Sequence, residues 1–116
     1  MYWMITGIGP EIADADLLST RIGAGSLPAE VREMIKKADQ AERLKLVERI
    51  SQNSEFLFDF RTKCDDGHLM YSGVCGDLDD ADESEAFAPL DYAMADVGAT
   101  TMEYRRKGSK DEWKVL

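Results

Sequence analysis

The alternating pattern of residues 56–64 constrains the fold more than any other feature of the sequence. Apolar or small side chains occupy every second position and charged side chains occupy most of the others, which is typical of a strand with one face on a core. Asp66 and Gly67 follow directly, and this dipeptide favours a tight hairpin turn. Residues 68–76 then have the composition of a return strand. The sequence therefore predicts an antiparallel hairpin.

A two-residue loop at Asp66 and Gly67 would fix the register of this hairpin. His68 would then point away from the face that carries Cys64. Cys64 and Cys75 would lie about 20 Å apart along the sheet, too far for a disulfide. The expected pairs gather the apolar side chains on one face: Cys64 with Leu69, Thr62 with Tyr71, Phe60 with Gly73 and Phe58 with Cys75.

Helical spacing of apolar residues predicts helices before the hairpin, at about 28–38 and 40–51. Asp39 and Glu42 have the spacing of a capping box, which separates the two helices; one long kinked helix is the alternative. Two shorter elements are expected before them. Residues 2–6 would form a short strand at a sheet edge or against the core. About two helical turns would follow from Pro10 to Leu18.

A second hairpin is predicted at the C-terminal end, where Thr100, Met102 and Tyr104 alternate with polar residues. A four-residue loop at 107–110 would place Tyr104 opposite Trp113 and Met102 opposite Val115. The chain length of 116 residues suits one domain.

We therefore expect a single α+β domain over residues 1–116, with a helical part at about 10–51 and a two-hairpin sheet at about 55–116. The helices would pack on one face of a small antiparallel sheet made of these two hairpins, with four or five strands.

Charge is distributed very unevenly along this chain. Residues 64–104 hold 11 acidic side chains and no Lys or Arg, so this part carries −11 and the rest +2 of the formal net charge of −9. We call residues 77–85 the acidic segment and expect a solvated loop or short exposed helix there, because Leu78 is its one large apolar residue. Residues 87–94 would dock back onto the core. The six acids of the segment are Asp77, Asp79, Asp80, Asp82, Glu83 and Glu85.

No pattern in the sequence predicts a catalytic, metal or cofactor site. Cys64 and His68 are close in sequence, but the expected register separates them, and with Cys75 they lack both the spacing and the fourth soft ligand of a zinc site. The acidic segment lacks the glycine and the residue order of a calcium-binding EF-hand loop. We therefore expect no cofactor, no metal and no enzymatic activity.

The acidic composition argues against direct binding to nucleic acid or to an anionic membrane, because that affinity comes from Lys and Arg. The first residues lack the features of a signal peptide, and no apolar run approaches a membrane span, so we expect a cytoplasmic protein. In size, acidity and lack of enzyme motifs, the chain resembles small phage- or mobile-element-encoded anti-CRISPR and anti-restriction inhibitors, some of which mimic nucleic acid. This resemblance implies a non-enzymatic inhibitor but assigns no residue roles.

These observations predict an acidic binding protein that blocks a basic, nucleic-acid-binding surface of a protein partner. The six acids of the acidic segment would supply charge, and Phe87 or Tyr92 nearby would supply an exposed apolar anchor. The alternative is a structural or accessory protein that self-associates through a sheet edge or helix face, with the acidic segment only aiding solubility. A homo-oligomer fits either hypothesis.

Overall fold

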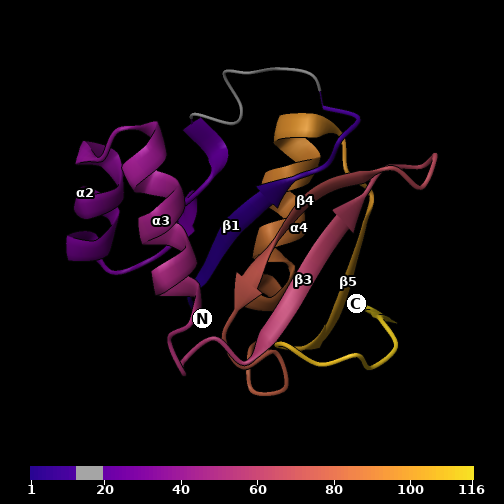
Figure 1. Cartoon of the computed structure of the whole chain (residues 1–116). Helices are drawn as coiled ribbons and strands as arrows, with labels where there is room; N and C mark the ends of the chain where they lie inside the picture. The colour runs from indigo at the N-terminus through magenta and orange to yellow at the C-terminus, as the bar shows by residue number, and fades with distance from the viewer. Residues whose placement is uncertain (13–19) are drawn as a thin grey trace.

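The computed structural model describes residues 1–12 and 20–116 and shows a six-stranded sheet flanked by helices (Figure 1). The strands follow the order β2-β1-β4-β3-β5-β6, and all neighbours are antiparallel. The expected α+β class is confirmed. In chain order the elements are β1 (Trp3–Ile8), β2 (Gly25–Ser26), α2 (Ala29–Lys37), α3 (Gln40–Ser51), β3 (Phe58–Lys63), β4 (Leu69–Cys75), α4 (Glu83–Val97), β5 (Thr101–Arg106) and β6 (Lys114–Val115).

The two helices predicted at 28–38 and 40–51 are confirmed as separate elements, α2 and α3. Ala38 and Asp39 between them have extended backbone, which excludes one continuous helix. The Asp39 carboxylate accepts a hydrogen bond from the Glu42 N–H at 2.9 Å and caps α3. Most of the helix predicted from Pro10 to Leu18 falls on residues 13–19, which lie outside the described residues.

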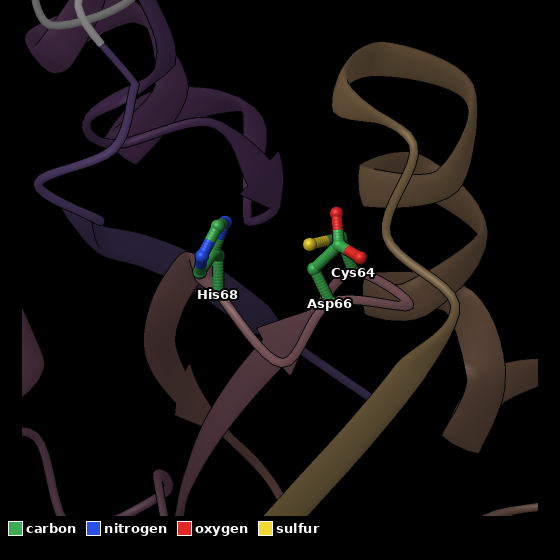
Figure 2. A group of neighbouring side chains, drawn as sticks. All are labelled: Cys64, Asp66 and His68. Carbon is green, nitrogen blue, oxygen red and sulfur yellow. The ribbon is translucent and has the colours of Figure 1, made fainter.

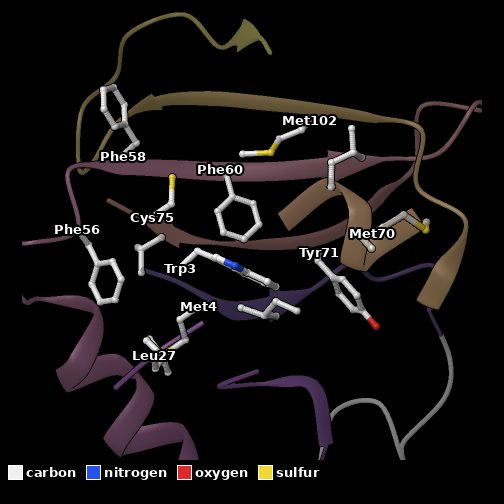
Figure 3. Packing of buried hydrophobic residues seen from close by; sticks show 14 of the residues in the cluster. Trp3, Met4, Leu27, Phe56, Phe58, Phe60, Met70, Tyr71, Cys75 and Met102 are labelled. Atoms are coloured by element: carbon white, nitrogen blue, oxygen red, sulfur yellow. The ribbon is translucent and has the colours of Figure 1, made fainter. Parts of the chain in front are cut away.

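The core extends to both faces of the sheet at β1, because Trp3, Met4 and Ile5 are all buried although neighbouring side chains on a strand point to opposite faces. Tyr92 of α4 packs on one face, with its ring 5.5 Å from that of Trp3. On the other face α3 lies beside β1 (Figures 1 and 3). The helices are thus divided between two faces, which differs from the single covered face that we expected.

The β3–β4 hairpin has the predicted register away from its turn, with Phe58 opposite Cys75 and Phe60 opposite Gly73. The turn itself is different. The Cys64 N–H donates to the His68 carbonyl at 3.1 Å, and the Gly67 N–H donates to the Cys64 carbonyl at 2.9 Å. Gly67 has a φ of 80°, as in a three-residue hairpin loop that ends in a left-handed glycine. The predicted two-residue loop is therefore wrong by one residue.

An irregularity in β4 absorbs this difference. The register shifts between the pairs Arg61 with Ser72 and Lys63 with Leu69, which leaves one extra residue on β4. There the fully buried Thr62 hydroxyl accepts a hydrogen bond from the Tyr71 N–H at 3.0 Å. A shift of one residue exchanges the two faces of a strand, so the turn brings Cys64 and His68 together instead of separating them.

The second hairpin also differs from its prediction by one residue. Glu103 pairs with Val115 and Tyr104 with Lys114, so Trp113 does not lie opposite Tyr104. Instead, the guanidinium carbons of Arg61 and Arg105 lie 4.3 and 4.2 Å from the centre of the Trp113 ring. Cation–π attraction holds the tryptophan on the polar face of the sheet.

The acidic segment is not a loop along its whole length. Asp82 caps α4, and Glu83 and Glu85 belong to the first helical turn. The residues expected to dock on the core are helical: Ala86, Leu90 and Ala93 of α4 are buried. The sequence predicted at most a short exposed helix within the acidic segment, because Pro89, which removes one helical N–H, argued against a helix that continues to Val97.

Candidate functional site

The acidic segment leaves β4 directly after Gly76 and enters α4, so ordered elements hold it at both ends. Leu78, the second residue of the segment, is 8% exposed and belongs to the hydrophobic core. All six carboxylates predicted for partner binding lie on exposed residues, at the end of the sheet opposite the β3–β4 turn (Figure 1). They are Asp77, Asp79, Asp80, Asp82, Glu83 and Glu85.

Three of these carboxylates stabilise the segment itself. Asp77 accepts a hydrogen bond from the Asp79 N–H at 3.1 Å, which closes a local turn. Asp82 accepts one from the Glu85 N–H at 2.8 Å, the same capping arrangement as at the start of α3. The Glu85 carboxylate lies 3.2 Å from the amino group of Met1.

The other three acidic side chains, on Asp79, Asp80 and Glu83, make no hydrogen bond or ion pair with any described residue. Asp79 also lines a cleft of about 250 Å³ whose lining includes Arg105 and Arg106 of β5. The same lining also contains Lys114 and the acids Asp111 and Glu112, so its charges balance. Asp80 and Glu83 have no ion-pair partner among the described residues.

Phe87 and Tyr92 do not have the exposure expected of a binding anchor. Both are partly buried and pack against the core. Burial also raises the pKa of the Tyr92 hydroxyl. The exposed apolar side chains near the start of the acidic segment are instead Tyr2 and Leu57, which are 43% and 37% exposed. Their backbones are hydrogen-bonded to Gly76 and Cys75, at the end of β4.

At the opposite end of β4, the turn gathers three side chains of different chemistry. The Cys64 sulfur, an Asp66 carboxylate oxygen and a His68 ring nitrogen all lie within 4.8 Å of one another (Figure 2). Asp66 and His68 are exposed, and Cys64 is half-buried. Cys75 lies at the other end of the strand, and both thiols are free.

A charged network that the sequence did not predict joins α4 to the N-terminal part of the chain. The Arg21 guanidinium donates to both carboxylate oxygens of Asp96, at 2.7 and 3.1 Å, and the Tyr71 hydroxyl donates to the same carboxylate. The hydrogen bond from Arg21 lowers the pKa of Asp96. Burial, and then the bond to Asp96, raise the pKa of Tyr71. Asp96 is therefore ionised and Tyr71 protonated at neutral pH.

A basic cleft of about 420 Å³ lies between β2 and the α2–α3 pair. Its described lining includes Arg32, Lys36 and Arg43 and contains no carboxylate. The Nε atom of Arg43 is buried and has no hydrogen-bond partner among the described residues. This cleft could not be predicted from the sequence, because its three cations come from two helices with acidic residues between them.

Comparison with protein-family models, curated proteins and solved structures finds no match to this chain. None of the described helices is long and apolar enough to span a membrane.

Proposed function

We propose that the chain is a non-enzymatic, cytoplasmic binding protein that occupies a basic, nucleic-acid-binding surface of a protein partner. It would act as an anti-defence inhibitor, in the manner of the anti-CRISPR and anti-restriction proteins that it resembles in type. The observation that carries the proposal is the acidic segment: six exposed carboxylates, with no Lys or Arg between residues 64 and 104, that extend from the end of β4 into the first turn of α4.

Electrostatics would act mainly on association. A one-signed field steers a basic partner toward the segment and speeds encounter, and added salt screens that effect. The ordered backbone favours a shaped surface, because little conformational entropy is lost when the segment binds. Asp79, Asp80 and Glu83 would supply charge that no internal contact uses, and Asp77, Asp82 and Glu85 would add charge while keeping the shape.

An apolar anchor is needed as well, since charge alone rarely gives a tight complex. Tyr2 and Leu57 replace Phe87 and Tyr92 in this role, because their side chains are exposed and their backbones are bonded to the end of β4. The binding surface would then combine the acidic segment with these two side chains.

A matched pair of triple variants tests the proposal. The first variant replaces Asp79, Asp80 and Glu83 by Lys. The second replaces three exposed acids of α2 and α3 by Lys, namely Glu30, Glu33 and Glu48. Both change the net charge equally, so only the position of the change differs. Immobilised wild-type chain and both variants would be incubated with a bacterial lysate and eluted over a salt gradient.

We expect basic proteins to be retained by the wild-type chain and the second variant and lost from the first. Duplex DNA should displace them, because it would compete for the same basic surface. Equal retention by the two variants would contradict the proposal.

Self-association is the second candidate function, and the helical layer favours it. Met34 and Leu44 are 54% and 50% exposed on α2 and α3, and a groove of about 400 Å³ runs between these helices. Analytical ultracentrifugation at two salt concentrations separates the two candidates. A dimer that is insensitive to salt supports self-association, whereas a monomer at both concentrations excludes it.

A further inference from the structure

The turn between β3 and β4 holds three potential metal ligands at one point. The Cys64 sulfur, an Asp66 oxygen and a His68 ring nitrogen are mutually within 4.8 Å. In Figure 2 the sulfur of Cys64 projects toward His68, with the Asp66 carboxylate beside it. The described part of the chain contains no other such group of three His, Cys, Asp or Glu side chains.

The backbone of the turn fixes this arrangement. Two hydrogen bonds, Cys64 N–H to the His68 carbonyl and Gly67 N–H to the Cys64 carbonyl, close the loop. Gly67 has a φ of 80°, a conformation that side-chain-bearing residues rarely adopt. Because the three side chains lie within five consecutive residues that are already ordered, little further entropy is lost when they bind a common ion.

We propose that Cys64, Asp66 and His68 form a binding site for a single divalent cation of the zinc class. Thiolate sulfur, imidazole nitrogen and carboxylate oxygen are the ligands that zinc takes in proteins. Tetrahedral coordination requires ligand atoms about 3.3–3.6 Å apart at the usual bond lengths. Starting from separations of at most 4.8 Å, the exposed side chains of Asp66 and His68 would have to move by about 1 Å to reach this spacing, which small rotations about their side-chain bonds supply.

Three protein ligands leave the fourth position of a tetrahedral ion open to solvent, where a water molecule binds. When the sulfur–metal bond forms, the Cys64 thiol releases its proton to solvent, since the thiolate is the ligand. Magnesium and calcium prefer sites built from oxygen atoms alone, so they compete poorly for this turn. They would bind only weakly, to the exposed carboxylates at the other end of β4.

Isothermal titration calorimetry with zinc chloride tests the site, on the chain without a polyhistidine tag and with excess magnesium chloride to occupy the acidic segment. We expect one zinc ion per chain. Cys64→Ser and His68→Asn should each weaken binding by at least about tenfold.

Asp66→Asn and Asp65→Asn form a matched pair, because both remove one carboxylate from the same turn and only Asp66 belongs to the group. Asp66→Asn should weaken binding, and Asp65→Asn should leave it within about twofold of the wild-type value. Unchanged binding in Cys64→Ser and His68→Asn would overturn the proposal, and so would equal losses in the two Asp variants. A ratio of one zinc ion per two chains would also overturn the proposal, because it would indicate a site shared between two copies of the chain.

Thiol alkylation gives a second readout that does not depend on heat of binding. Cys75 is fully buried, and burial raises its pKa to about 12, so in the folded chain it should not react at neutral pH. Iodoacetamide should therefore label Cys64 alone, and zinc should slow that labelling at least about tenfold, because a metal-bound sulfur is shielded. Magnesium serves as the control ion. Labelling of Cys64 at the same rate with zinc and with magnesium would overturn the site.

Discussion

The two connections at the ends of β4 contain side chains that could bind a ligand, but they are built in opposite ways. The turn at Cys64–His68 has few such side chains, of three different chemistries, and they converge. The acidic segment has six of one kind, all exposed, and only three make contacts within the described chain. A high count of like charges gives an electric field, whereas convergence gives a coordination site.

This difference also explains which of the two connections the sequence reveals. A run of carboxylates can be recognised from the residue types alone, and it stays a run of carboxylates whichever register the neighbouring strands adopt. The convergence of Cys64 and His68 depends on that single residue, because each step along a strand exchanges its faces. Composition therefore predicts surfaces more reliably than it predicts sites.

Replacing Thr62 by Val should produce the largest loss of stability, and the local change in structure should be confined to the turn end of β4. The Tyr71 N–H would lose its acceptor in a fully buried position, at a cost of about 2 kcal/mol in the free energy of unfolding. Urea denaturation measures the loss, with Thr100→Val at an exposed position as the control. Hydrogen exchange should accelerate at Gly67 and stay unchanged at Glu85. A loss below about 0.5 kcal/mol would show that the hydroxyl does not fix the irregularity.

Asp96→Asn tests the contact between α4 and β4, because the Asp96 carboxylate, near the C-terminal end of α4, accepts a hydrogen bond from the Tyr71 hydroxyl. We expect a loss of about 1.5 kcal/mol at pH 7, the lower end for charged hydrogen bonds, because the side chain is 20% exposed. The folded pKa of Asp96 lies below the ordinary 3.8. The variant's loss in the free energy of unfolding should therefore be largest well above pH 3.8. It should become smaller as the pH falls through the folded pKa of Asp96.

Urea denaturation at pH 7 and at pH 3 measures the free energy of unfolding of the wild-type chain and of Asp96→Asn. A difference that stays constant between the two pH values would contradict a role for the Asp96 charge.

Asp82→Ala should produce the smallest effect, about 1 kcal/mol, because it removes the side-chain cap of α4. Asp80→Ala is the matched control, because it removes an equal charge two residues away that makes no hydrogen bond or ion pair with a described residue. It should change stability by less than about 0.5 kcal/mol. Thermal unfolding followed by circular dichroism measures both. Equal losses would mean that charge density, and not the capping bond, stabilises the acidic segment.

Much of the fold could be predicted from the sequence where several signals agreed. Periodicity and the pair Asp39 and Glu42 predicted α2 and α3 correctly, and alternation predicted the core register at Phe58 and Phe60. The start of α4 carries the same signal in Asp82 and Glu85, so the helix could have been found. Pro89 obscured it, because proline usually ends a helix.

The turn could not be predicted from the dipeptide Asp66 and Gly67 alone. A glycine with positive φ serves a two-residue loop and also ends a three-residue loop, and only the hydrogen bonds of Cys64 distinguish the two. The same limit applies at Trp113, whose place depends on Arg61 and Arg105 from other strands. Contacts between residues that are distant in sequence determine both the turn and the place of Trp113, so a local sequence pattern does not predict either.

The irregularity at Thr62 and Tyr71 has a consequence for how this hairpin can change. The longer loop and the extra residue of β4 shift the pairing in opposite directions, so the core pairs at Phe58 and Phe60 keep the register of an ordinary two-residue hairpin. The loop is thus one residue longer than a two-residue hairpin allows, and the core pairs are unchanged. A loop of the same length but different content could therefore be grafted between Lys63 and Leu69 without realigning the strands below, which makes this hairpin a scaffold for new ligands.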